Sequence, residues 1–148
     1  MLRQITVEDI QDIIAISYYD GLQASNLEQA IAMQEEIRAD YLRGDSIHWG
    51  IIDRTTNKIV GTCGYYRGFL EGAGELGCIL LPQYYGQGYM TLSMQLAIDY
   101  GLTTMRLKRI YAITSRENEK AIQLLERLNF TRIKALDDPY LEFDLTSN

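Results

Sequence analysis

The most constraining feature of the chain is a glycine-containing turn between two apolar segments. The apolar run 78–81 leads into the turn at residues 82–91, and the apolar segment 92–102 follows it. This order predicts a strand, a tight turn and a helix. Because Gly86 and Gly88 lack Cβ atoms, successive backbone N–H groups can converge there, and the helix N-terminus adds its own unpaired N–H groups. Such a cradle suits a diphosphate, although an ordinary tight turn explains the glycine pair equally well.

This turn differs from the two common phosphate-binding motifs. It lacks the third glycine of the Gly-x-Gly-x-x-Gly motif, and it lacks the Gly-Lys-Ser/Thr ending of a P-loop. The interpretation of the glycine pair therefore depends on the elements around it rather than on its own sequence.

The rest of the chain alternates between strand-like and helix-like segments without a linker. Thr6 followed by Asp9 is typical of a helix start. The next apolar residues have helical spacing and predict one helix that ends at Gly21: Ile10, Ile13, Ile14 and Tyr18. Further helices are expected between Asn26 and Gly44, at 89–102 and at 121–128, and strands at 2–5, 47–51, 59–66, 75–81, 109–114, 131–135 and 140–145. This order predicts one mixed α/β sheet covered by helices.

Size and charge limit the function classes. A chain of 148 residues, 47% of them hydrophobic, can form one packed core, so we expect a single domain over residues 1–148. The net charge of −6 argues against a nucleic-acid partner and favours a cationic one such as an amine. No apolar run approaches the ~20 residues that span a bilayer, so no membrane partner is expected. The first residues lack the apolar core of a signal peptide, which favours a cytoplasmic location.

The cysteines and the histidine do not indicate a metal site. Cys63 and Cys78 fall within expected strands, which predicts buried thiols rather than a disulfide. His48 is the single histidine and lies beside Trp49 in another expected strand. One histidine makes neither a His-rich metal site nor a Ser-His-Asp triad, so we expect a structural role for it and no metal.

The second half of the chain resembles a known enzyme family. The residues that support the resemblance are Pro82 at a strand end, the turn Tyr85-Gly86-Gln87-Gly88-Tyr89-Met90, the strand at 109–114, Asn118 and the segment 124–130. In this register the chain resembles the GNAT superfamily of acetyl-CoA-dependent N-acetyltransferases, in particular the branch that acetylates the N-terminal alanine of ribosomal proteins. The resemblance covers roughly residues 47–135. Tyr85, Gly88 and Met90 occupy the defined positions of the superfamily loop Gln/Arg-x-x-Gly-x-Gly/Ala, and such variants look like that branch.

The resemblance implies a GNAT-like fold with a mostly antiparallel central sheet and acetyl-CoA as cosubstrate. In the family the pantetheine arm lies between two splayed strands and bonds to the backbone of the first, while the diphosphate lies on the N–H groups of the loop. A linear amide ligand can act as an extra strand in this way. The residues implied for acetyl-CoA are Cys78, Ile79, Leu80, Tyr85, Gly86, Gln87, Gly88, Tyr89, Met90, Thr91 and Asn118. Asn118 also suits an ordinary helix N-cap.

The resemblance also implies the catalytic residues for direct attack of an amine on the thioester. Glu75 is the first candidate for the base that accepts the amine proton, and the backbone N–H of Leu80 is implied as the donor to the oxyanion. An exposed carboxylate at a strand end is the alternative interpretation of Glu75. Glu71, in a glycine-rich loop, is a weaker candidate.

This chain has apolar residues at the positions where related enzymes have a general acid for the departing thiolate. Many family members have tyrosine where this chain has Leu125, and the ribosomal-protein branch often has serine where it has Ala121. The residues that could substitute are Tyr65, Tyr66 and Tyr111. A catalytically weak or silent acyl-CoA-binding domain is therefore the alternative to an enzyme, and an α/β domain unrelated to CoA is a third interpretation.

The acceptor amine is the least defined part of the prediction. In a GNAT-like fold residues 18–30 and 67–74 would flank the acceptor. Their mixed side chains do not separate a peptide N-terminus from a small amine; they include Tyr18, Tyr19, Asp20, Arg67, Phe69 and Glu71. A homodimer is common in the family, and the sequence leaves the oligomeric state open.

Overall fold

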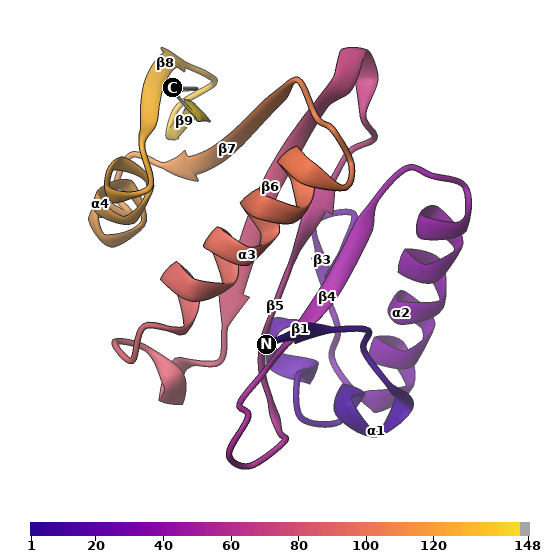
Figure 1. Ribbon diagram of the computed structural model, residues 1–148. Coiled ribbons are helices and arrows are strands. Elements are labelled where there is room, and N and C mark those ends of the chain that lie inside the picture. Colours follow the sequence, from indigo (N-terminus) through magenta and orange to yellow (C-terminus); the bar gives the residue numbers. More distant parts are fainter. Residues whose placement is uncertain (146–148) are drawn as a thin grey trace.

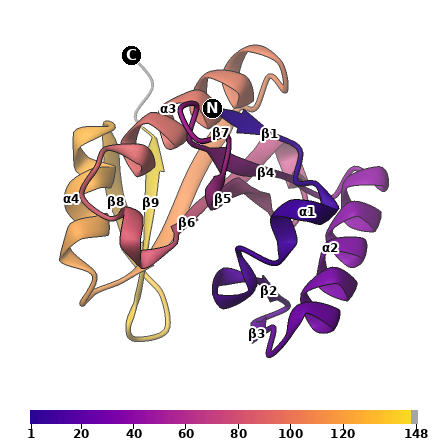
Figure 2. The same ribbon diagram turned by 90° about the horizontal axis from the view of Figure 1, so that it is seen from below.

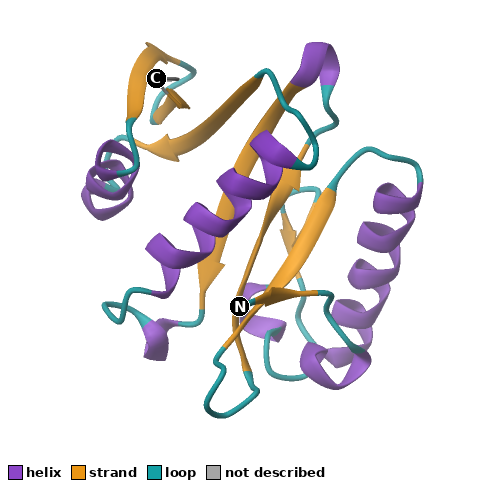
Figure 3. Cartoon of the chain, in the orientation of Figure 1, coloured by secondary structure: helices purple, strands orange, loops and turns teal. Residues whose placement is uncertain are grey.

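The computed structural model describes residues 1–145, which contain one seven-stranded sheet with helices on both faces (Figure 1, Figure 3). The strands lie in the order β1-β4-β5-β6-β7-β9-β8. Their bounds are Leu2–Arg3 (β1), Ile47–Ile52 (β4), Ile59–Tyr66 (β5), Ala73–Leu80 (β6), Arg109–Ser115 (β7), Phe130–Ala135 (β8) and Tyr140–Leu145 (β9). β6 and β7 pair in parallel, and the other neighbours in this sheet pair antiparallel. The predicted mixed, mostly antiparallel sheet is confirmed.

Four α-helices cover the sheet within the described residues. Their bounds are Val7–Ile10 (α1), Leu27–Leu42 (α2), Tyr89–Thr103 (α3) and Glu119–Arg127 (α4). α3 and α4 pack on one face of the sheet. α1 and α2 lie on the other face, over the strands that come from the N-terminal half of the chain (Figure 2). The largest cluster of buried apolar side chains joins the sheet to α3 and α4 and includes Tyr65, Met94 and Leu125. Burial of this apolar surface is the main stabilising contribution to the fold.

The segment after α1 differs from the predicted helix. α1 ends at Ile10, a 3₁₀ turn spans Ile14–Ile16, and a hairpin follows with strands Tyr18–Tyr19 (β2) and Leu22–Gln23 (β3). Asp20 and Gly21 form the turn with φ values of 52° and 78°. Positive φ at both central residues is the geometry of a type I′ turn, for which Asp-Gly is a preferred pair. The helical prediction across Tyr18 was therefore wrong, because Gly21 belongs to a hairpin rather than to a helix end.

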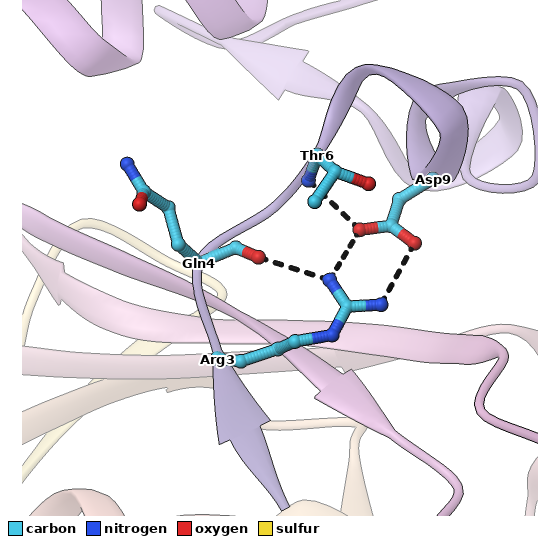
Figure 4. Close-up of polar contacts among 4 residues, drawn as sticks. All are labelled: Arg3, Gln4, Thr6 and Asp9. Atoms are coloured by element: carbon cyan, nitrogen blue, oxygen red, sulfur yellow. Dashed lines mark hydrogen bonds and ion pairs between the residues drawn. The ribbon is translucent and has the colours of Figure 1, made fainter.

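The predicted helix starts are confirmed by their side-chain contacts. The Thr6 N–H donates to Asp9 Oδ2 at 2.8 Å, and Arg3 holds the same carboxylate through two hydrogen bonds of 2.6 and 3.1 Å (Figure 4). At the start of α2 the Asn26 side chain accepts a hydrogen bond from the Gln29 N–H at 2.9 Å. These contacts satisfy N–H groups that the first turn of a helix leaves without partners. They also connect α1 to β1, since Arg3 lies in that strand.

Candidate active site

The site begins where two central strands of the sheet separate. β6 and β7 pair over three residues, from Ala73 with Arg109 to Glu75 with Tyr111. Beyond Glu75 the two strands diverge, as Figure 1 shows, and residues 76–80 keep a strand partner only on the β5 side. The divergence leaves the backbone edge of β6 free to pair with another extended chain.

The direction of the β6 backbone groups follows from the ladder with β5. The Leu81 N–H donates to the Val60 carbonyl at 2.9 Å, so the backbone of Leu81 points toward β5. Since backbone direction alternates along a strand, Ile79 also points toward β5, whereas Cys78 and Leu80 point into the gap. Of the three residues implied for pantetheine, Cys78 and Leu80 therefore offer backbone groups to the gap. Ile79 instead lines the pocket, and the residue is 37% exposed.

The glycine turn forms an open cradle at the end of β6. Gly86 and Gly88 have φ values of 75° and 86°, and α3 begins at Tyr89, directly after Gly88. Among the described residues, the N–H groups of residues 86–91 donate no hydrogen bond within the chain. Residues 85–88 are exposed. The cradle therefore presents a run of free donors at the positive end of the α3 dipole, which suits a diphosphate.

Two side-chain hydrogen bonds hold the starts of α3 and α4, near the gap. The Tyr89 hydroxyl donates to Asp53 Oδ2 at 2.9 Å, which attaches the β4–β5 turn to the first residue of α3. The Asn118 side chain accepts a hydrogen bond from the Ala121 N–H at 3.2 Å and is the N-cap of α4, three residues after β7 ends. The structural interpretation of Asn118 is thus confirmed, and its role toward CoA stays a prediction.

A large pocket lies on the α2 side of the sheet, next to the gap. Its volume is about 1070 Å³, and residues 76–79 of β6 form part of its wall. Tyr18, Tyr19, Asp20 and Arg67 line it, as expected for residues that flank an acceptor. Phe69 instead packs against the main core, and Glu71 does not line the pocket.

Glu75 lies at the point where the gap and the pocket meet. It is the last β6 residue paired with β7, and its side chain lines the pocket although the residue is only 9% exposed. Its Oε2 accepts a hydrogen bond from Arg67 Nε at 3.1 Å, while its Oε1 is buried without a partner among the described residues. Burial raises the pKa of the Glu75 carboxyl, and the Arg67 charge partly opposes this rise. A carboxylate with a raised pKa is suited to accept a proton near neutral pH.

Two aromatic side chains lie beside Glu75 on the same face of the sheet. Tyr66 is directly opposite Glu75 in the β5–β6 ladder, and its ring covers Gly77, where a Cβ atom would lie 2.7 Å from Tyr66 Cε2. The His48 ring lies 5.9 Å from the Tyr66 ring, between centroids. Burial lowers the pKa of His48 to about 4 and raises that of Tyr66 well above its usual value. Both side chains are therefore neutral near pH 7.

His48 was expected to have a structural role, yet it lines the pocket with a buried Nδ1 that has no partner in the described part of the chain. No local signal in the sequence indicates this position, because it results from the pairing of β4 with β5. A neutral imidazole can accept or donate a hydrogen bond there.

The three tyrosines that are candidates for a general acid have different surroundings in the structure. Tyr65 faces the α3 side of the sheet and donates its hydroxyl hydrogen bond to the Ala97 carbonyl at 2.7 Å, so it does not line the pocket. Tyr111 lies under Arg109, with the guanidinium carbon 4.5 Å from its ring centroid. Leu125 is buried in the core. Of the three, Tyr66 is the one that lines the pocket.

The remaining predictions concern the thiols, metals and membranes. Cys63 and Cys78 are free thiols that face one another across β5 and β6; Cys63 is buried as predicted, whereas Cys78 is only partly buried. Residues 1–145 contain no group of three or more His, Cys, Asp or Glu side chains placed to hold a metal ion. Within the same residues no helix is long and apolar enough to cross a membrane.

Comparison with known proteins agrees with this geometry. The family profile described as an acetyltransferase (GNAT) domain matches residues 1–131. The Bacillus subtilis protein described as the uncharacterized N-acetyltransferase YoaA is 30% identical over 140 residues, which cover 89% of this chain and 79% of that protein.

Two solved structures share the fold at low sequence identity. A variant of the spermidine N-acetyltransferase SpeG of Vibrio cholerae matches with a TM-score of 0.83 and 17% identity, over 97% of this chain and 91% of that one. The ribosomal-protein-S5-alanine acetyltransferase of Vibrio fischeri matches with a TM-score of 0.77 and 19% identity, over 97% and 90%. The separated strands, the glycine cradle and these matches together lead to one conclusion: the chain belongs to the GNAT family of acetyltransferases, a family that uses acetyl-CoA as its acetyl donor.

Proposed function

We propose that the protein transfers the acetyl group of acetyl-CoA to a primary amine in a ternary complex. The pantetheine arm would lie in the gap between β6 and β7, with its amides on the backbone of Cys78 and Leu80. The diphosphate would lie on the free N–H groups of residues 86–91. The acceptor would enter from the pocket on the opposite side of β6.

The position of Glu75 is the observation that supports this proposal most strongly. A buried carboxylate with one unpartnered oxygen lies where the cosubstrate gap meets the pocket. Such a group costs folding free energy unless a ligand completes its hydrogen bonds. We therefore assign it a role toward the acceptor rather than a role in packing.

The chain's own groups supply what the reaction requires. Bound acetyl-CoA provides an activated thioester whose carbonyl carbon an amine can attack. Glu75 accepts a proton from the acceptor ammonium, directly or through water, and frees its nitrogen lone pair. The Leu80 N–H points into the gap and donates to the carbonyl oxygen as negative charge develops there. The departing thiolate has a thiol-like pKa, so it can leave with little assistance. Of the three candidate tyrosines, Tyr66 is the one that lines the pocket and could return a proton.

The pocket favours an acceptor with positive charge. Besides Glu75, its lining includes the carboxylates of Asp20, Asp40 and Asp45. Arg43 partly offsets this charge, because it forms ion pairs with both Asp40 and Asp45. The names of the structural relatives include acetylation of spermidine and of a ribosomal-protein alanine, which correspond to the two acceptor classes we propose: a small amine or a protein N-terminus.

Replacement of Glu75 by glutamine tests the proposal. We expect Glu75→Gln to lower kcat for thiol release by about 10²–10⁴-fold, because the general base is lost, and to leave the Kd for CoA unchanged. The amine panel would include a polyamine and a peptide with N-terminal alanine. Glu71→Gln is the matched control, since Glu71 does not line the pocket, and it should keep activity. Unchanged turnover in Glu75→Gln would show that another group is the base.

A silent acyl-CoA-binding domain is the second candidate, and one observation favours it. Leu125 and Ala121 occupy the places where family members often have the acid or a serine, and Leu125 is buried in the core. This alternative predicts CoA binding in the gap with no thiol release for any amine of the panel. Release with one amine would exclude it.

A further inference from the structure

The loop between β5 and β6 holds Arg67 in an uncommon backbone conformation at the pocket wall. Arg67 has a φ of 64° and is followed by Gly68 at 77°. The Gly68 N–H donates to the Asp45 carbonyl at 2.7 Å, which attaches the loop to the segment before β4. Positive φ costs free energy at a non-glycine residue, so surrounding contacts must hold Arg67 in this position.

The side chain of Arg67 reaches from this loop to Glu75. Its Nε lies 3.1 Å from Glu75 Oε2, and both residues line the pocket. The two partners are unequally exposed: the Arg67 side chain is 75% exposed, and that of Glu75 is 11% exposed. The guanidinium therefore lies on the solvent side of a buried carboxylate, where a ligand in the pocket would also approach.

We propose that Arg67 occupies the position of the acceptor's ammonium group in the unliganded protein and is displaced when the acceptor binds. This inference rests on the proposed function in one respect, namely that Glu75 faces the acceptor. A guanidinium and an alkylammonium both donate charge-assisted hydrogen bonds to a carboxylate, so one can replace the other. The exchange requires no other change in the site, since Arg67 can move into solvent.

The strength of the pair is compatible with displacement. An ion pair with one highly exposed partner contributes little to stability, because water and salt screen it. It still favours the ionised form of Glu75, which burial alone disfavours. Arg67 thus favours the charged carboxylate while the site is empty, and the acceptor takes over that role.

The other charged or titratable groups around Glu75 do not supply this positive charge. Tyr66 on β5 and Tyr111 on β7 face it and are neutral, with pKa values raised by burial. The Glu142 side chain on β9 raises the pKa of Glu75 further. Arg109 forms ion pairs with Glu142 and Asp144. Among the described residues, Arg67 is the cation in contact with Glu75.

The first test measures the ionisation of Glu75 without any acetyl donor. Carboxyl ¹³C NMR of the protein labelled in glutamate would follow Glu75, whose resonance is identified by its loss in Glu75→Gln. We expect the Glu75 titration to move to higher pH in Arg67→Gln and to stay near the original midpoint in Arg67→Lys. Arg67→Gly, which suits the φ of 64°, serves as a second neutral variant. An unchanged titration in both neutral variants would overturn the proposal.

The second test uses methylammonium as the probe of the vacated position. Its binding shifts the Glu75 resonance, and tetramethylammonium, which has no N–H, is the control at equal ionic strength. We expect methylammonium to bind Arg67→Gln about two- to fivefold more tightly than the wild type at a pH where Glu75 is ionised in both, because it no longer competes with Arg67. Equal or weaker binding, or no binding to either protein, would contradict displacement. Neither test needs turnover, so failure of the acetyl-transfer proposal is seen separately, in the thiol-release assay.

Discussion

At the scale of single residues, Asp9 shows how a buried charge supports the N-terminal part of the fold. Asp9 is 7% exposed and accepts hydrogen bonds from the Arg3 guanidinium and the Thr6 N–H (Figure 4). Burial alone would raise the pKa of the Asp9 carboxyl, yet these hydrogen bonds outweigh it and hold the pKa below its usual value. Stability from the ionised carboxyl is therefore present above the usual carboxyl range and is lost as pH falls through the lowered pKa.

We expect Asp9→Asn to lower the free energy of unfolding by about 1–3 kcal/mol at neutral pH, because Arg3 loses a charged partner. The difference should shrink as the pH approaches the lowered pKa, where the wild-type carboxyl also becomes protonated. Urea unfolding at several pH values measures this. Asp12→Asn, at an exposed position three residues later, is the control. Equal effects of the two substitutions would contradict the assigned role.

Glu75 has the opposite sign of pH dependence. Because its pKa is raised in the folded state, the wild-type protein loses stability as pH rises from the usual carboxyl range through the raised pKa. Glu75→Gln lacks this titration, so we expect its Tm relative to the wild type to increase with pH. Calorimetry between acidic and mildly alkaline pH measures the trend. A difference in Tm that does not vary with pH would show that the carboxyl is not perturbed.

The sequence predicts some of these residues better than others. Glu75 and Leu80 were proposed from the family resemblance, because both lie on the strand that the resemblance assigns to the cosubstrate, and their catalytic roles stay predictions. The Arg67–Glu75 contact was not predicted, since it depends on a loop with positive φ at Arg67 and on the pairing of Tyr66 with Glu75. His48 was placed in the correct strand, but its position in the pocket wall depends on the register of β4 with β5.

At the scale of elements, the cradle before α3 has a matched control elsewhere in the chain. Gly88 at the start of α3 and Gly44 after α2 have φ values of 86° and 81°, and a Cβ atom would meet open space at both. Alanine at either position should therefore cost a similar backbone strain of about 1–2 kcal/mol. Only Gly88 belongs to the run of free N–H groups proposed to hold the diphosphate.

We expect Gly88→Ala to weaken CoA binding by about tenfold or more, because a small change in backbone conformation redirects those N–H groups and about 1.4 kcal/mol corresponds to a factor of ten. Gly44→Ala should lose similar thermal stability and keep its affinity for CoA. Isothermal titration calorimetry with CoA compares the two. Equal affinities would mean that the cradle does not hold the diphosphate.

Elements also show where prediction from sequence fails. The helices α3 and α4 were predicted correctly from their apolar periodicity, because one face of each packs against the main core. The predicted helix α2 also forms, but Ala30 is its one buried residue, and Tyr41 of the predicted apolar face is exposed. The helical periodicity from Ile10 to Tyr18 was misleading, since this segment forms a short helix, a 3₁₀ turn and the first strand of a hairpin instead of one long helix. The Asp20-Gly21 pair was the local signal for the hairpin.

At the scale of the whole molecule, the proposed function depends on a gap between β6 and β7 that no local pattern encodes. β6 and β7 pair over residues 73–75 and then separate, and their separation exposes the edge of β6 to a ligand. The sequence predicts both strands, but the point where their pairing ends depends on how two segments far apart in the chain pair with each other. The resemblance to the GNAT family was therefore needed to expect it.

The most direct test of the central claim is thermal unfolding with saturating acetyl-CoA, with free CoA and with NADH as comparisons. A ligand at a hundred times its Kd stabilises the folded state by about 2.7 kcal/mol, which corresponds to several degrees for a domain of this size. We predict an increase in Tm with acetyl-CoA and with CoA, and no increase with NADH. An unchanged Tm with both CoA compounds would contradict the assignment of the gap and the cradle to acetyl-CoA.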